Sequence, residues 1–180
     1  LKPLESILIE IYKFIISHVD IIEQDKLPGA TIGSKLIIGD ESFSSLYEII
    51  DRYVNPCANY VRNAIQNRKF IHCEKLSDFE TKLKEEKQKV LTIINYNFTI
   101  LPEYPSYIIL GYVPKVTPIL EYIKVKAKGL YFHNQYFNDL EGIISFFKSK
   151  YGTEKYHDFV RKVRPPTIEY YRNIENETGR

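Results

Sequence analysis

The sequence predicts an α+β fold made of two similar units in tandem, each an antiparallel sheet flanked by helices, with a helical connector between them. The main observation is a repeat: FSSLYEIIDRYV at residue 43 returns as FNDLEGIISFFK at residue 137. The matched residues, all offset by 94 positions, are Phe43 and Phe137, Leu46 and Leu140, Ile49 and Ile143, Ile50 and Ile144, and Tyr53 and Phe147. Each copy follows β-branched segments of strand length, which favours a duplicated unit over one helix of a single domain.

Composition sets the limits of this prediction. The chain has 180 residues, 44% of them hydrophobic and 14% aromatic, which is enough for a packed core. The net charge of +2 gives no argument for sequence-independent nucleic-acid binding, and no apolar run has the length of a membrane span. Cys57 and Cys73 form no CxxC pair, so we expect no disulfide framework or zinc site, and a reducing compartment. The chain starts at Leu1, without methionine, as expected for a soluble fragment of a longer protein.

The first half is expected to contain three strands and two helices. β-branched residues predict antiparallel strands at 7–12 and 15–22, a loop at 23–31 and a short strand at 35–38. The apolar spacing of the repeat predicts a helix from Phe43 to Tyr53. Asn55-Pro56 is predicted to end it, because proline lacks an amide donor and disfavours helical geometry in the preceding residue. A second helix, the connector, should start there with Asn55 as its cap and run to about Arg68.

The second half is expected to contain a helix, three strands, a short hairpin and another helix. The ranges predicted for these elements are a charged helix at 79–87, strands at 90–101, 107–112 and 119–126, a hairpin in LYFHNQYF, and a helix from about Asn138. Asn138 and Glu141 are predicted to form its capping box. A last helix is predicted at 153–163. The expected domains are residues 1–70, with the connector, and 71–164, followed by a tail at 165–180.

The order of these elements, and the phrase F-x-x-L-x-x-I-I-x-x-[YF] in both copies, resemble Src-homology-2 units. Residues 7–151, including IISHVDI, KLIIGDESFSSLYEIIDRYVNPCANYVRNAIQNRKF, YIILGYVP and GLYFHNQYFNDLEGIISFFKSKYG, resemble the tandem module of the suppressor-of-Ty-six family of transcription elongation factors and histone chaperones. The resemblance implies a nuclear, monomeric, non-enzymatic module without a cofactor or membrane contact. Its implied partner is the phosphorylated linker or C-terminal region of the largest RNA polymerase II subunit.

The resemblance also indicates phosphate-binding residues in the first unit. His18 falls on the fourth-strand histidine position of that family, although a half-buried histidine without a ligand would also fit the strand. Lys2, in LKPLES, stands where the family has an arginine, and Ser6 can supply a hydroxyl donor. Lysine lacks the planar fork of arginine, so affinity should be lower. Either this pocket is degenerate, or the start of the unit lies outside the chain.

The second unit is expected to bind phosphate differently. Its matching strand, LTIINYNFTIL, has no basic residue, so a standard phosphotyrosine pocket is excluded. Lysines on the flanking helices are the expected replacement, and the candidates are Lys75, Lys82, Lys148 and Lys150. Any one of them alone is more often a solvated surface lysine, so only a cluster would support phosphate binding. Shallow lysine patches accept phosphoserine or phosphothreonine, so we expect an extended peptide with more than one phosphate.

Other functions have weaker support. The sequence lacks the common nucleotide-binding, metalloprotease and serine-hydrolase motifs, so we expect neither catalytic residues nor a metal. Lysines alternate with aromatics in one stretch, which would suit single-stranded nucleic acid or a solvated strand face beside core aromatics. The residues concerned are Lys124, Lys126, Lys128, Tyr131, Phe132 and Tyr136, with a basic end at Arg161, Lys162 and Arg164. A purely structural docking role is a third interpretation.

Overall fold

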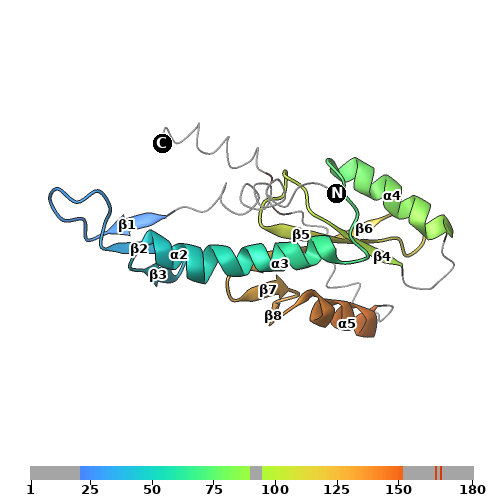
Figure 1. Ribbon diagram of the computed structural model, residues 1–180. Coiled ribbons are helices and arrows are strands. Elements are labelled where there is room, and N and C mark those ends of the chain that lie inside the picture. Colours follow the sequence, from blue (N-terminus) through green and yellow to red (C-terminus); the bar gives the residue numbers. More distant parts are fainter. Residues whose placement is uncertain (1–20, 90–94, 152–164, 166, 168–180) are drawn as a thin grey trace.

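The computed structural model describes residues 21–89, 95–151, 165 and 167 (Figure 1). It is an α+β structure with two antiparallel sheets, one of three strands and one of five, in those residues. The predicted strand at 7–12, most of the strand at 15–22, the helix at 153–163 and nearly all of the tail lie outside the described residues. Those predictions therefore stay predictions.

The three-stranded sheet is a meander of short strands. Its members are β1 Ile22–Gln24, β2 Lys35–Ile38 and β3 Glu41–Phe43, in the order β1-β2-β3. The prediction of a loop from residue 23 is thus wrong at its start, because β1 continues to Gln24. β3 was not predicted, although Gly39 and Asp40 form a two-residue hairpin turn in which Gly39 has a φ of 60°. A glycine–aspartate pair between strands is a known signal for such a turn.

One uninterrupted helical stretch follows the sheet. It consists of α2 Leu46–Ile49, the π-helical turn η1 Ile50–Val54 and α3 Asn55–Gln66. Two predictions are wrong here: Phe43 ends a strand instead of starting the helix, and Asn55-Pro56 neither breaks the helix nor caps a new one. Asn55 has helical angles (φ −61°, ψ −45°), and its amide donates to the carbonyl of Ile50, five residues back. The wider π turn lies just before Pro56, so the chain stays helical past a residue that lacks an amide donor.

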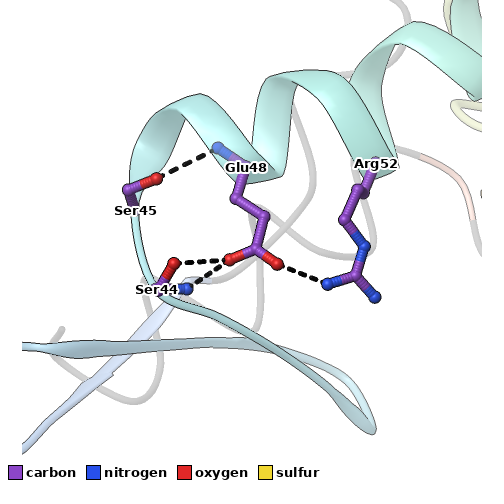
Figure 2. Close-up of polar contacts among 4 residues, drawn as sticks. All are labelled: Ser44, Ser45, Glu48 and Arg52. Atoms are coloured by element: carbon purple, nitrogen blue, oxygen red, sulfur yellow. Dashed lines mark hydrogen bonds and ion pairs between the residues drawn. The ribbon is translucent and has the colours of Figure 1, made fainter.

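The helix begins at a cap that the sequence analysis missed (Figure 2). Ser45 Oγ accepts a hydrogen bond from the Glu48 amide at 3.2 Å. Glu48 Oε2 in turn accepts bonds from the Ser44 amide (2.6 Å) and hydroxyl (2.7 Å), and its other oxygen accepts from Arg52. The spacing Ser-x-x-Glu is the sequence signal of such a capping box. The bond from the Ser44 amide, followed by those from the Ser44 hydroxyl and Arg52, lowers the pKa of Glu48 to about 2.

This shift predicts a pH-dependent stability. The pKa of Glu48 falls from 4.5 to about 2 on folding, so its stabilising effect is complete above pH 4.5 and is lost as the pH falls towards 2. We expect Glu48→Gln to lower the urea midpoint slightly at neutral pH, because the carboxylate is partly exposed to solvent and therefore screened. The difference from the parent protein should shrink between pH 4.5 and 2. Urea titrations followed by circular dichroism check this, and an equal difference at neutral and acid pH would contradict it.

The five-stranded sheet forms the larger part of the structure. Its strands are β4 Tyr96–Thr99, β5 Tyr107–Tyr112, β6 Ile119–Lys126, β7 Gly129–Phe132 and β8 Gln135–Phe137, antiparallel in that order. The bounds predicted for β5 and β6, and the hairpin of β7 and β8, are confirmed. Residues 69–71 extend the sheet in parallel beside β4, because the Ile71 amide donates to the Phe98 carbonyl (2.8 Å) and the Phe98 amide to the Lys69 carbonyl (2.9 Å).

Helices cover both faces of this sheet. α4 Leu76–Lys89, longer than predicted, packs on one face through Phe79 and Leu83, against Ile109. α3 and α5 Leu140–Lys150 share the other face. The α5 cap is Asp139, whose carboxylate accepts from the Gly142 amide at 2.7 Å, so the prediction of Asn138 as the cap is wrong by one residue. The alternating side chains of β5 thus serve two separate layers of core.

The 94-residue repeat corresponds to a repeated local structure: a strand ends, one residue caps, and a helix starts. Ser45 and Asp139 are the two caps, and Leu46 and Leu140 each follow them. The surroundings differ, since Leu140 is 6% exposed and Leu46 is 46% exposed. The same apolar pattern is therefore largely buried in the second copy, where α3 packs beside α5.

Candidate functional site

The candidates of the first unit cannot be placed. Lys2, Ser6 and His18 all lie outside the described residues, so their phosphate-binding role stays a prediction.

The four lysines predicted for the second unit do not form one cluster. Lys82 lies on α4 and Lys75 just before it, whereas Lys148 and Lys150 lie in the last turn of α5. α4 and α5 cover opposite faces of the five-stranded sheet, so the two pairs are separated by the sheet. Only one pair at a time can contact a single phosphate group.

The lysines beside α4 are partly committed to other contacts. The Lys82 ammonium donates to the carbonyl of His72 at 2.8 Å. It also lies by Cys73, where burial raises the pKa of the thiol and the positive charge of Lys82 acts in the opposite direction. Lys75 is exposed. On this side of the sheet the Lys82 ammonium is therefore hydrogen-bonded to the backbone, and Lys75 is a separate exposed lysine. The two do not share a contact that would make them one site.

Lys148 of α5 lies at the same tyrosine ring as Lys69, a lysine that the sequence analysis did not nominate. Lys148 Nζ lies 5.8 Å from the ring centroid of Tyr96, and Lys69 Nζ lies 5.9 Å from the same centroid. Lys69 Nζ also donates to Asn95 Oδ1 at 3.2 Å. We call Lys69 and Lys148 the Tyr96 lysine pair. Neither ammonium forms an ion pair with a described carboxylate. Two cations without a described carboxylate partner therefore lie within about 6 Å of one ring centroid, which concentrates positive charge there.

Hydrogen bonds hold both the backbone amide and the backbone carbonyl of Lys69. Its amide donates to Asn67 Oδ1 at 2.9 Å, and its carbonyl accepts from the Phe98 amide and from Asn97 Nδ2 (3.3 Å). Tyr96 itself is 6% exposed and packs edge-on against Phe147 of α5 at 5.5 Å. The pair is therefore positioned by sheet pairing and by the core, and the Lys69 ammonium is held in addition by its hydrogen bond to Asn95.

A second polar contact, between His133 and Glu121, holds parts of the fold together. His133 Nε2 lies 2.5 Å from Glu121 Oε2, and both side chains are largely buried. His133 belongs to the turn between β7 and β8, has a φ of 48°, and contacts the Phe146 ring of α5 at 5.6 Å. This contact joins β6 to the turn and to α5, and so supports the helix that carries Lys148.

Two other kinds of feature are absent from the described residues. No group of three or more histidine, cysteine, aspartate or glutamate residues in that part of the chain could hold a metal ion. No described helix combines the length and the apolar composition that crossing a membrane requires.

Comparison with known proteins places the chain in a family context. The family model for the SH2 domain matches residues 5–150. An SPT6-like transcription elongation factor of Arabidopsis thaliana is 32% identical over 148 residues, or 79% of this chain. SPT6 of Drosophila melanogaster is 32% identical over 140 residues, or 74% of this chain. The chain spans only 11% and 8% of the lengths of these two relatives.

Two solved structures share the fold. One is a tandem SH2 domain of the elongation factor Spt6, which binds the phosphorylated RNA polymerase II C-terminal repeat domain. It aligns with a TM-score of 0.64 at 22% identity, covering 77% of this chain and 72% of that one. The tandem SH2 domains of Antonospora locustae Spt6 align with a TM-score of 0.57 at 20% identity, covering 73% of this chain and 66% of that one.

Proposed function

The chain belongs to the SH2 domain family, with SPT6 elongation factors among its sequence relatives, and from that premise we propose that it is a non-catalytic phosphopeptide-binding module of a nuclear transcription elongation factor. SH2 domains are recognised as phosphate-binding modules that use basic clusters. The observation that carries the proposal is the Tyr96 lysine pair, in which α5 and the segment paired with β4 bring two lysines to a strand that has no arginine.

We propose that the module contains two SH2 units. Residues 1–70 form the first with its connector, residues 71–164 form the second, and residues 165–180 form a tail. The repeated strand, cap and helix support this division, as do the two separate sheets. α3 is the proposed connector: it continues the helix that starts at the small sheet, and it packs on the five-stranded sheet. A continuous helix would hold two binding sites at a set distance.

The Tyr96 lysine pair suits a phosphorylated serine or threonine. A phosphate carries about −1.5 to −2 charges and three acceptor oxygens, which two ammonium groups can bind together. The ammonium groups belong to long side chains, and Lys148 is exposed, so they can meet the short side chain of a phosphorylated serine or threonine at the surface. Lys150, in the same last turn as Lys148, extends the basic surface. Lys75 and Lys82 are assigned a secondary role on the opposite face.

The proposed partner is the phosphorylated linker or C-terminal region of the largest RNA polymerase II subunit. The tandem SH2 domain of Spt6 binds the phosphorylated C-terminal repeat domain of that polymerase, which supports a related ligand here. In the first unit, Lys2, Ser6 and His18 are the proposed phosphate contacts. Two weak sites on one monomer would gain apparent affinity by effective concentration, provided that the peptide spans both.

Phosphopeptide titration tests the proposal. We expect affinity to rise from the unphosphorylated to the singly and then the doubly phosphorylated polymerase peptide, as measured by fluorescence anisotropy. Lys69→Ala with Lys148→Ala should weaken the doubly phosphorylated peptide by about tenfold or more, because each ammonium forms a charge-assisted bond with phosphate. Lys84→Ala with Lys115→Ala removes the same charge from exposed positions elsewhere and should change affinity little.

The first unit is tested by Lys2→Ala with His18→Ala, which should also weaken the doubly phosphorylated peptide. Equal binding of all three peptides would contradict the proposed function. Phosphate-dependent binding that survives the Lys69 and Lys148 substitutions would instead mean that the second pocket is misplaced.

A further inference from the structure

One part of the five-stranded sheet carries tyrosines and lysines that the phosphate site does not use. The strand register aligns Tyr107 of β5, Lys124 of β6, Tyr131 of β7 and Tyr136 of β8 directly opposite one another. Residues paired in this way lie on the same face of a sheet. Lys126, two residues after Lys124, lies on that face as well. We call these five residues the tyrosine–lysine row.

The lysines of the row lie over its rings. Lys124 Nζ is 5.9 Å from the Tyr107 centroid, and Lys126 Nζ is 5.1 Å from Tyr131 and 5.6 Å from Tyr136. Lys126 Nζ also lies 3.2 Å from the Tyr136 hydroxyl oxygen. The rings of Tyr131 and Tyr136 are 5.0 Å apart and tilted. The two ammonium groups of β6 are therefore flanked by the rings of β5 on one side and of β7 and β8 on the other.

The row is accessible at its β6 to β8 end. α4 packs on the same face but over β4 and β5, through residues such as Phe79 and Leu83. Lys124 is exposed, and Tyr136 is 47% exposed. No described carboxylate forms an ion pair with Lys124 or Lys126. Lys128 differs, because it lies 3.5 Å from Glu41 and 3.7 Å from Asp40, and so is not part of the row.

We propose that the tyrosine–lysine row binds single-stranded nucleic acid. Bases stack on exposed aromatic rings, and ammonium groups beside the rings contact the phosphates of the same strand. Stacking of this kind is tolerant of base sequence. A phosphorylated serine would use only the ammonium groups, since its short side chain has no use for two neighbouring rings. The combination of rings and cations in one row therefore fits a nucleotide strand better than a phosphopeptide.

The net charge of the chain is only +2, so the positive charge of the tyrosine–lysine row is confined to that row and its neighbourhood. Binding should therefore be modest and strongly dependent on salt, since each phosphate contact releases counterions. It should also be independent of the Tyr96 lysine pair, because Tyr96 projects into the core shared with α5, whereas the row lies on the face that carries α4.

Fluorescence anisotropy with labelled oligouridine and oligodeoxythymidine at low ionic strength tests the proposal. Tyr136→Ala should weaken both oligonucleotides about fivefold or more, the loss typical of one stacked base, while Tyr136→Phe keeps the ring and most of the binding. Tyr47→Ala, at a 78% exposed tyrosine of α2, is the matched control and should bind like the parent protein. Lys124→Gln with Lys126→Gln should reduce the slope of log affinity against log salt by about 1.4.

Several outcomes would overturn the proposal. These are the absence of saturable oligonucleotide binding, equal binding by Tyr136→Ala and Tyr136→Phe, or a salt slope that the lysine substitutions leave unchanged. If the row variants weaken the doubly phosphorylated peptide and not the oligonucleotides, the row is a phosphopeptide surface instead. Retained oligonucleotide binding by the Lys69 and Lys148 variant would support it and would separate it from the proposed phosphopeptide function.

Discussion

Phe147→Ala is expected to lower the free energy of unfolding by about 3–5 kcal/mol, the usual cost of removing a fully buried aromatic side chain. Phe147 of α5 is 0% exposed. Its ring contacts those of Tyr112 at 5.0 Å, Tyr151 at 5.4 Å and Tyr96 at 5.5 Å. Loss of the ring leaves a cavity between α5 and the sheet. It also removes the support of Tyr96, so phosphopeptide affinity should fall in the variant even where it remains folded.

The repeat supplies a control for this prediction. Tyr53 occupies the matching position 94 residues earlier, but it is only partly buried, with Phe43 as its ring partner at 6.4 Å. Tyr53→Ala should therefore cost clearly less than Phe147→Ala in the same urea titrations. A loss below about 1 kcal/mol at Phe147, the size of an average substitution, would contradict the packing described here.

Gly111→Val is expected to destabilise the sheet side that carries α4 by more than the 1–3 kcal/mol typical of overpacking. A Cβ at Gly111 would lie 2.5 Å from Leu83 Cδ1 and 2.6 Å from Phe79 Cε1. Both side chains are buried, and Phe79 is 0% exposed, so neither can move aside cheaply. α4 would have to lift from β5. Thermal unfolding measures the loss in stability, and hydrogen exchange of the α4 amides shows whether this helix is the part that loosens.

A second substitution identifies the cause. Gly111→Ala combined with Leu83→Ala should cost less than the sum of the two single changes, because the smaller side chain makes room for the new Cβ. Strict additivity would mean that the glycine is needed for some reason other than the close approach of α4.

The sequence predicted the middle of the five-stranded sheet well. β5 and β6 were predicted with their observed bounds, because they are long β-branched or aromatic runs, and prolines at positions 105, 114 and 118 flank them. Short elements were predicted less well. Phe43 shares the apolar spacing of the helix, and a three-residue strand such as β3 has too few residues to show the alternation of a strand.

The proline rule failed for a physical reason. It holds that Pro56 removes a hydrogen bond from an α-helix and collides with the preceding turn. Here a π turn precedes the proline, and that turn has a different hydrogen-bond spacing, so the conflict does not arise. The local sequence gave no clear sign of a π turn. By contrast, Ser45 and Glu48 formed a readable cap signal, which the assignment of Phe43 to the helix obscured.

The candidate site was predicted only in part, because one of its two lysines is placed by a contact between distant parts of the chain. Lys148 could be nominated from its place in a flanking helix. Lys69 could not, because its position depends on the parallel pairing of residues 69–71 with β4, a contact between residues far apart in the chain. Such pairings leave no periodic pattern in a single sequence. The coincidence of the two lysines at one tyrosine ring appears only once the sheet and α5 are in place.

The π turn at Ile50–Val54 also sets the rotational phase of the long helix. One extra residue in a turn rotates everything after it by about 100° relative to an unbroken α-helix. Ile49 before the turn packs on the three-stranded sheet, whereas Cys57 and Val61 after it pack on the five-stranded sheet. A single helix can thus direct one apolar face to the three-stranded sheet and, after the turn, another to the five-stranded sheet.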